Sequence, residues 1–410
     1  MEITNIEIKN NKNVAHIVLD NDETIQIIGS FLYGNVYHLF LTKIVNDKKV
    51  LFSYKTKDFT EIIERAELKK YEKSDIIKLI NLSGLYYFVI FSNNKFFCYS
   101  VEPFIELNFE LIDDLSSTGH ETNLNVKDFT IFYINDTFYA LLFIENEQKE
   151  IETQIFASKE FKSEYKIIKN FGSLHLVDDT VNSLSSYYKD GLVYVLFDSK
   201  KHKSYSSKVM IFKYDEGTKF EILMLSSYSF LSNERHAFFI QGKQNNLFIS
   251  SILSKENSSK TFLTLPKIIS YEKGKFLKKP AKLILNRIIS VNDFDFSSKL
   301  SSRSLVKIDA DKPFKLSFNN TNSTMKILFF EQKFAVEKDK KTILILDTKK
   351  AVISLFILLD EDIVEIGINK GEEFVSFCFN QSNLDFDVEI VNDKAIKNFQ
   401  IGSFKNEQWF

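Results

Sequence analysis

Short runs rich in Val, Ile, Phe and Tyr recur along the whole chain and are separated by Asn, Asp and Gly. Runs of this kind are typical of β-strands, and the residues between them are typical of tight turns. No long stretch keeps its apolar residues at the spacing of an amphipathic helix. The pattern therefore predicts an all-β protein.

Five pairs of turn residues, each flanked by apolar runs, mark hairpins at regular intervals. Their residue types tolerate the positive φ angles that tight turns require. The second residues of successive pairs lie 59, 42, 55 and 55 residues apart, close to the period of about 40 to 50 residues of propeller blades with insertions. A two-sheet sandwich would not need so long a repeating unit. The spacing predicts five blades, with turns at Gly34-Asn35, Asn93-Asn94, Asn135-Asp136, Asp190-Gly191 and Asn245-Asn246.

The pattern changes after the fifth hairpin. A polar, serine-rich stretch begins at Ser290 and is typical of a connector, and alternating strands resume after it. We therefore predict three parts. They are a five-bladed β-propeller over residues 1–285, a linker over residues 286–302 and a C-terminal β-sandwich over residues 303–410.

Composition and charge narrow the class of protein. Of the 410 residues, 44% are hydrophobic and 26% are charged, as in soluble globular proteins. The formal net charge is −2 without a basic stripe, so we expect no nucleic-acid partner. The first residues show no signal-peptide pattern and no apolar run could span a bilayer. We expect a cytoplasmic protein without a membrane partner, with reduced core thiols at Cys98 and Cys378.

Metal and cofactor chemistry has little support in the sequence. The six histidines show no pair at metal-ligand spacing, and the two cysteines do not join them. The chain has no glycine loop of the kind that cradles phosphates and no Gly-x-Ser-x-Gly nucleophile motif. We therefore predict no cofactor and no metal.

Two segments carry a more specific signal. The first, from Thr261 to Ile284, reads TFLTLPKIISYEKGKFLKKPAKLI, and the second, from Ile353 to Phe379, reads ISLFILLDEDIVEIGINKGEEFVSFCF. Both resemble signature segments of the β-fructofuranosidases of glycoside hydrolase family thirty-two, which include invertases, levanases and sucrose-6-phosphate hydrolases. The resemblance implies a catalytic propeller followed by a sandwich, with a site for a fructose-containing sugar in the axial funnel of the propeller.

The family's catalytic motifs can be carried over residue by residue. The letters YHLF at residues 37–40 match a hairpin strand of the family, which puts the nucleophile of its Asn-Asp-Pro-Asn-Gly motif at Gln26. The Arg-Asp-Pro motif becomes Lys127-Asp128, so the resemblance gives Asp128 the role of transition-state stabiliser and a place in the funnel. Counting back from the fourth hairpin puts the acid/base glutamate at Asn182. The resemblance thus implies that the wall of the funnel contains Gln26, Lys127 and Asn182.

The residue types at these positions argue against hydrolysis. An amide cannot attack an anomeric carbon as a carboxylate does, and it has no acidic proton to give. Gln26 and Asn182 therefore predict an inactive protein whose funnel still binds a carbohydrate or a partner. Two alternatives stay open: an active hydrolase of sucrose, sucrose 6-phosphate or fructan in which Asp22 or Asp179 supplies a carboxylate, and a protein-interaction scaffold. The sequence also leaves a homo-oligomer open.

Overall fold

Strands make up most of the computed structural model, and no α-helix occurs among the residues that it describes. The all-β prediction is confirmed. The structure describes residues 17–404 except 20–23, 58, 60–61, 83–84, 94, 102–108, 115–123, 162–164, 175–179, 202–203, 216–218, 228–233, 242–246, 255–260, 282–287, 294–298, 302, 322, 331, 349–352, 361–362 and 380–384.

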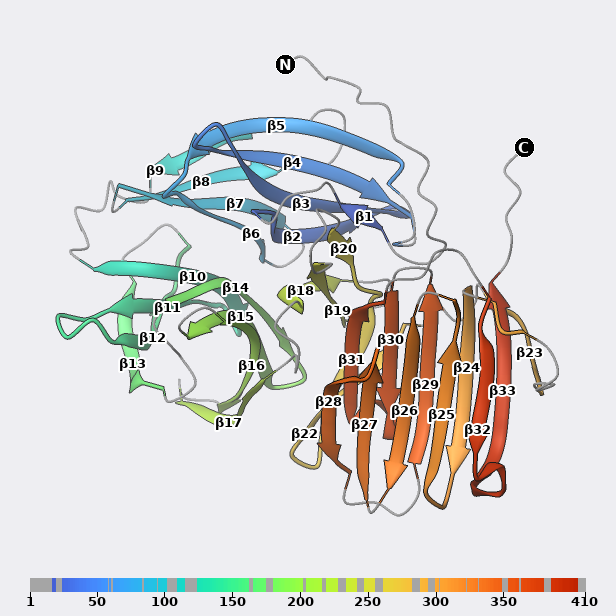
Figure 1. The fold of residues 1–410 in the computed structure, drawn as a ribbon. Helices are drawn as coiled ribbons and strands as arrows, with labels where there is room; N and C mark the ends of the chain where they lie inside the picture. The colour runs from blue at the N-terminus through green and yellow to red at the C-terminus, as the bar shows by residue number, and fades with distance from the viewer. Residues whose placement is uncertain are drawn as a thin grey trace.

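Five antiparallel sheets, which we call the N-terminal lobe, follow one another along the first two thirds of the chain (Figure 1). Each of the first four contains four strands hydrogen-bonded in chain order. These strands are β2 (Gln26–Tyr33), β3 (Val36–Val45), β4 (Lys48–Thr56) and β5 (Glu64–Glu72); β6 (Ile76–Leu82), β7 (Leu85–Ser92), β8 (Lys95–Val101) and β9 (Phe109–Asp114); β10 (Asn125–Ile134), β11 (Thr137–Glu145), β12 (Ile151–Ser158) and β13 (Lys166–Ser173); and β14 (Thr180–Lys189), β15 (Leu192–Lys201), β16 (Ser204–Asp215) and β17 (Lys219–Ser227).

The fifth sheet has six strands and ties the start of the chain to the end of the lobe. Strand β1 precedes the first sheet in sequence, yet it pairs with β20 of the fifth sheet. The strands of this sheet are β1 (Val18–Leu19), β18 (Glu234–Gln241), β19 (Leu247–Ser254), β20 (Thr261–Leu263), β21 (Lys267–Glu272) and β22 (Lys275–Pro280).

The first strands of the five sheets contact one another in a cycle. Strand β2 contacts β6, β6 contacts β10, β10 contacts β14, β14 contacts β18, and β18 returns to β2. Among the described strands no backbone pairing joins one of these five sheets to the next, and no sheet closes on itself. Aromatic side chains fill the spaces between neighbouring sheets; Phe40 and Phe88 meet edge to face with ring centroids 5.0 Å apart, as do Phe143 and Phe197. Side-chain packing therefore holds the cycle together.

Two of the predicted hairpin turns are confirmed by their backbone angles. Asn135 and Asp136 have φ angles of 46° and 56° between β10 and β11, and Asp190 and Gly191 have φ angles of 52° and 78° between β14 and β15. Residues that tolerate positive φ are required there, because both central residues of such a two-residue turn adopt it. The predicted turn at Asn245-Asn246 falls outside the described residues.

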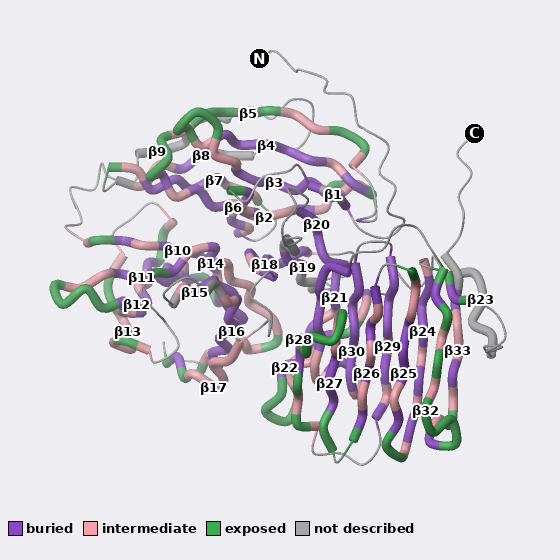
Figure 2. Tube along the Cα trace, in the orientation of Figure 1, coloured by how far each residue is buried: buried purple, intermediate pink, exposed green. Residues whose placement is uncertain are grey.

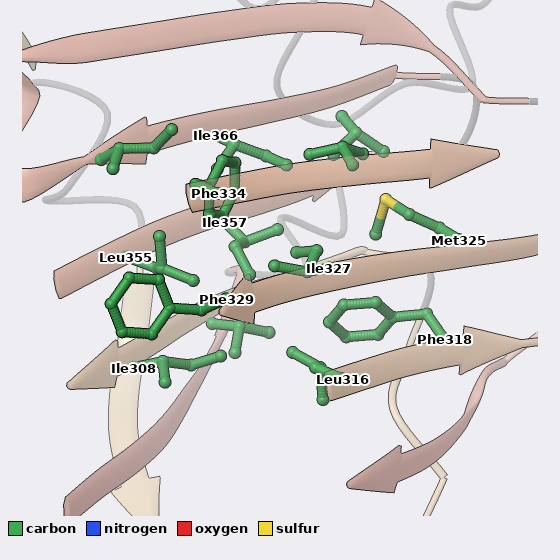
Figure 3. Close-up of a cluster of buried hydrophobic side chains, with 14 of the residues drawn as sticks. Ile308, Leu316, Phe318, Met325, Ile327, Phe329, Phe334, Leu355, Ile357 and Ile366 are labelled. Atoms are coloured by element: carbon green, nitrogen blue, oxygen red, sulfur yellow. The ribbon is translucent and has the colours of Figure 1, made fainter. Parts of the chain in front are cut away.

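Two further sheets, which we call the C-terminal lobe, face each other across one core (Figure 3). Apolar side chains of both sheets interdigitate there, among them Leu355 and Ile357 from one sheet and Leu316 and Ile327 from the other. One sheet runs β23 (Ile288–Asp293), β33 (Ile396–Phe404), β24 (Arg303–Ala310), β29 (Ile353–Asp360), β30 (Ile363–Ile368) and β31 (Glu373–Cys378), and the other runs β28 (Lys341–Asp347), β27 (Lys333–Lys338), β26 (Thr324–Phe330), β25 (Phe314–Asn319) and β32 (Asp387–Val391).

Strand β23 lies within the segment predicted as a linker and pairs with β33 at the edge of its sheet. Two 3-10 turns, η3 (Asn369–Gly371) and η4 (Asp393–Ala395), complete the described elements of this lobe. Buried residues line the inner strands of both lobes, while exposed residues gather at hairpin ends and outer strands (Figure 2). Both cysteines are buried, and no disulfide joins them. The described part of the chain contains no helix with the length and hydropathy needed to cross a membrane.

The two lobes meet through β31 and η3, which contact β19 and β22 of the fifth sheet. Lys267 and Glu365, 1% and 0% exposed, form an ion pair of 3.1 Å across this interface, and Leu265 N donates to Glu365 Oε1 at 2.8 Å. Gly371 has a φ of +92°, and a Cβ added there would lie 2.0 Å from the Lys278 carbonyl oxygen. Only glycine fits this contact.

Candidate functional site

Four of the five first strands carry a β-bulge near their beginning. The pairing register shifts between Ile27 and Gly29 in β2, at Val126/Asp128 in β10, at Asn182/Ser185 in β14 and at Arg235/Phe238 in β18. Strand β6 pairs with β7 without a shift. A bulge re-aims side chains and is common beside functional sites. Because the first strands contact one another in a cycle, these bulges bring polar side chains of different sheets together.

Asp128 is the best-connected of these side chains and is 2% exposed. Its Oδ1 lies 2.7 Å from Lys78 Nζ of β6, and its Oδ2 accepts hydrogen bonds from the same amine at 2.9 Å and from Leu184 N of β14 at 2.8 Å. The amide of Phe129 also donates to Oδ1 at 2.8 Å. The carboxylate therefore joins three sheets, and a buried cation neutralises it.

Lys78 is itself almost fully enclosed. Its side chain is 7% exposed, and its amine also donates to the Leu184 carbonyl oxygen at 2.9 Å. Buried lysines persist in proteins when they are paired in this way. The amine thus bridges the carboxylate on β10 and the backbone of β14, and it occupies the space beside Asp128.

Gln26 and Asn182 meet through Ser183, which follows Asn182 in the bulge of β14. Gln26 Nε2 donates to Ser183 Oγ at 3.1 Å, and the Ser183 hydroxyl lies 3.3 Å from Asn182 Oδ1, to which it can donate. The next residue, Leu184, provides the amide that binds Asp128. The structure thus brings Gln26, Asn182 and Asp128 together from three sheets. We call these residues with Lys78 and Ser183 the Asp128 site.

Lys127 is not brought to this site. Its amine pairs with Glu145 of the neighbouring strand β11 at 3.0 Å, and the side chain is 33% exposed. Lys127 is the extra residue of the bulge in β10 and reaches to β11, whereas Asp128 reaches to Lys78 of β6. The carboxylates Asp22 and Asp179, named as alternative acids, lie outside the described residues.

A second lysine, Lys49 of β4, comes close to the Asp128 site from the first sheet. Its amine donates to the backbone oxygen of Asp75, just before β6. Burial is the main cause that lowers the pKa of Lys49; the charge of Lys78 lowers it further, while Asp128 and Asp75 oppose the shift. The amines of Lys78 and Lys49 therefore lie in the same surroundings as the buried carboxylates of Asp128 and Asp75.

Asp198 of β15 and His236 of β18 extend the network on the side of Ser183. Asp198 is 1% exposed and accepts hydrogen bonds from the His236 backbone amide at 2.9 and 3.1 Å and from Ser207 Oγ at 2.6 Å. Burial alone would raise the pKa of Asp198, but the charge of His236 and these hydrogen bonds outweigh it, and the pKa lies below its usual value. Asp198 thereby locks the bulge in β18.

The group of Ser183, His236 and Asp198 does not have the geometry of a Ser-His-Asp triad. Asp198 Oδ2 lies 2.8 Å from His236 Nδ1, and the hydroxyl of Ser183 contacts the same nitrogen. In a triad the carboxylate and the serine bind opposite nitrogens of the ring, so that the base can carry a proton between them. Here both compete for one nitrogen, and the group serves to hold Ser183 beside Gln26.

A cavity of about 280 Å³ continues along the first strands beyond the bulges. All five first strands line it, and hydrogen bonds join lining residues of different sheets. The Asn81 amide donates to Gln241 Oε1 at 2.5 Å, and the hydroxyls of Thr130 and Ser186 lie 2.8 Å apart. Lys78 is in its wall, but Gln26, Asp128 and Asn182 are not. We call this space the axial cavity.

Several of these residues escaped the sequence analysis. Lys78 had a signal, because it is a lone cation in the otherwise apolar run from Ile76 to Ile80. Asp198 had a similar one, because it ends the apolar run of β15. His236 and Ser183 had none, since their positions depend on bulges with φ angles of 54° and 57°. In the described part of the chain, no group of three or more His, Cys, Asp or Glu side chains could hold a metal ion.

Comparison with known proteins shows which folds this chain resembles. No protein-family profile matches the sequence. No curated protein matches it either. Among solved structures, sucrose-6-phosphate hydrolase from Lactobacillus gasseri matches with a TM-score of 0.71 and 13% identity over 95% of this chain and 91% of that one.

Two more solved structures match to a similar degree. The β-fructofuranosidase from Schwanniomyces occidentalis matches with a TM-score of 0.71 and 10% identity over 96% of this chain and 97% of that one. Fructan 1-exohydrolase IIa from Cichorium intybus matches with 0.70 and 13% over 96% of both chains. The resemblance to the β-fructofuranosidases is thus confirmed in the fold, and the chain is a divergent example of that fold.

Proposed function

We propose that this chain is a fructofuranosidase-like protein that binds a fructose-containing sugar and does not cleave it. Its five N-terminal sheets act as the blades of a propeller over residues 1–285, joined through a linker at residues 286–302 to a sandwich over residues 303–410. The observation that carries the proposal is the buried ion pair of Asp128 with Lys78, set beside the amides of Gln26 and Asn182.

The chemistry of retaining hydrolysis supports the loss of activity. It needs two carboxyl groups about 5 to 5.5 Å apart, one to attack the anomeric carbon and one to protonate the leaving oxygen. Among the described residues of the Asp128 site the only carboxylate is Asp128, and three nitrogen donors already occupy its two oxygens. Neither Gln26 nor Asn182 can act as nucleophile or acid. A sugar bound here would meet hydrogen-bonding groups and no catalytic pair.

The same groups suit recognition of sugar hydroxyls. Gln26 and Asn182 are only half-buried, and amide side chains both donate and accept hydrogen bonds. The Schwanniomyces occidentalis structure is a complex with fructosyl-erythritol, which favours a fructose-containing ligand for this chain as well. The absence of a disulfide between the two buried cysteines favours a reducing compartment, in line with a cytoplasmic protein.

Two assays on the purified chain test the proposal. Fructose release from sucrose, sucrose 6-phosphate and levan should stay at background, while ligand-observed NMR should detect binding of fructose or sucrose. Asn182→Ala should weaken that binding, and Asp136→Asn, in an exposed turn, should not. Turnover at ordinary enzyme rates of roughly 1 to 1000 per second would refute the proposal.

The two alternatives predict different results in the same assays. An active hydrolase would release fructose, and Asp22→Asn or Asp179→Asn would then abolish that release. A scaffold would bind none of the sugars, and a partner would dock on an apolar surface instead. Among the large exposed apolar side chains of the described surface, Leu85 and Ile167 lie on different sheets, whereas Phe330, Ile345 and Val391 share one sheet of the C-terminal lobe, where a scaffold would dock its partner.

A further inference from the structure

The axial cavity differs from the Asp128 site in position. Its wall includes bulge residues such as Gly29 on β2 and Ser185 on β14 and continues along the strands beyond them. Lys78 belongs to both, since its Nζ binds Asp128 and the Leu184 carbonyl while the residue lines the cavity. The ion pair thus forms the end of the cavity that lies toward the Asp128 site. A molecule in the cavity would lie beyond the pair.

The charge of the cavity wall limits which ligand could bind. Among the described residues of the wall, Lys78 is the only Lys, Arg, His, Asp or Glu side chain, and Asp128 neutralises it. A charged ligand would therefore lose its hydration without gaining an ion-pair partner, which is costly in a partly buried site. A neutral ligand does not meet this cost.

The polar groups of the wall point to a ligand with several hydroxyl groups. Ser30, Thr130, Ser185 and Ser186 present hydroxyls, and Asn81 and Gln241 present amides. The Ser185 hydroxyl is buried and has no hydrogen-bond partner among the described residues. A buried polar group normally finds a partner, so this hydroxyl has capacity for a bound molecule.

Aromatic rings complete the wall. Tyr86, Tyr133, Tyr187 and Tyr188 line the cavity beside three phenylalanines. Burial, and then the proximity of Tyr187, raise the pKa of Tyr86 to about 12, so its hydroxyl stays protonated and can donate at neutral pH. Apolar ring faces with a few placed polar groups are typical of small-molecule sites, and a volume of 280 Å³ is near the lower end of their range of about 300 to 1,000 Å³.

We propose that the axial cavity is a second binding site, separate from the Asp128 site, for a small neutral polyol of about the size of a monosaccharide. The ring faces of the tyrosines would cover its carbon skeleton, and the hydroxyl of Ser185 would gain the partner that it lacks. The site does not depend on the proposed sugar binding at Asp128, because none of Gln26, Asp128 and Asn182 lines it.

The first test compares two molecules that differ in one charged group. Sorbitol and gluconate have six carbons each and differ by a carboxylate in place of a primary alcohol. Titration of the full chain with each, followed by calorimetry and by ligand-observed NMR, should show saturable binding of sorbitol and none of gluconate at the same concentrations. Binding of both alike, or of neither, would overturn the inference.

The second test places the bound sorbitol with variants. Ser186→Leu fills the cavity and should abolish sorbitol binding, and Ser185→Val removes one hydrogen bond and should raise the Kd by about two- to tenfold. Circular dichroism checks that each variant folds, and Ser185→Val keeps the test valid if Ser186→Leu does not. If Asn182→Ala abolished sorbitol binding while both serine variants kept it, the polyol would bind at the Asp128 site. The second site would then be wrong, and the proposed function would stand.

Discussion

Replacement of Lys78 with methionine should lower the free energy of unfolding more than the substitution of a surface residue does. The substitution keeps the length of the side chain but removes the amine that binds both oxygens of Asp128 and the Leu184 carbonyl. Asp128, 2% exposed, would keep only the backbone amides of Phe129 and Leu184 as donors. Removal of one partner of a buried ion pair costs about 3 to 5 kcal/mol, because the other charge stays buried without compensation.

The loss should appear as a lower free energy of unfolding than that of the wild-type protein. Urea unfolding followed by far-UV circular dichroism measures it.

Two further variants make this experiment decisive. Lys127→Met removes a neighbouring lysine whose pair with Glu145 is partly exposed, and it should cost less than about 1 kcal/mol. Lys78→Met combined with Asp128→Asn removes the uncompensated charge and should recover much of the stability lost in the single variant. A single variant no less stable than Lys127→Met, or a double variant as unstable as the single one, would contradict the assignment of a buried ion pair.

Three other predictions follow from single positions. Gly371→Ala should lower the free energy of unfolding by about 4 kcal/mol or more, because its Cβ would meet a backbone oxygen. Gly274→Ala, also at positive φ but with open space around it, should lower it by about 1 to 2 kcal/mol. Equal losses in denaturant unfolding would refute the clash. Burial, and then the charge of Lys55, lower the pKa of His38 to about 4, below its value in the unfolded chain. The free energy of unfolding should therefore fall by up to about 3 kcal/mol as pH drops from 6.5 to 4. His38→Phe should remove this part of the pH dependence, and an unchanged decrease at acid pH in that variant would disprove it. Burial is the main cause that lowers the pKa of Lys278 to about 8, so the unfolded chain binds more protons above that pH, and thermal midpoints should rise from about pH 8 to 10 in the wild type but not in Lys278→Met.

The fold could be predicted from local features of the chain. The turn residues at Asn135-Asp136 and Asp190-Gly191 require particular backbone angles whatever surrounds them, and the structure has these angles. Alternation of apolar residues then sets the strands between the turns. Both signals act over a few residues, which is why they can be interpreted without knowledge of the tertiary structure.

The site depends on contacts between sheets, and these have no local signal. The alignment that put Gln26, Asp128 and Asn182 in one place relied on a family resemblance, and the structure brings the three together. The lysine that neutralises Asp128 comes from another sheet, 50 residues away in sequence, and no motif links the two. Lys127 shows a second limit of the alignment. One position along a bulged strand decides which face a side chain occupies, and the sequence does not show the bulge.

The interface between the lobes has a consequence for how this architecture can be recombined. The two segments that resemble the β-fructofuranosidases are the ones that meet there, since Lys267 and Leu265 of the first bind Glu365 of the second. An N-terminal lobe made alone would leave Lys267 without its carboxylate, and a C-terminal lobe from another protein would need both a carboxylate at the place of Glu365 and a glycine at the place of Gly371. The lobes are therefore not interchangeable modules. Exchange of one lobe between proteins would require exchange of the other lobe as well.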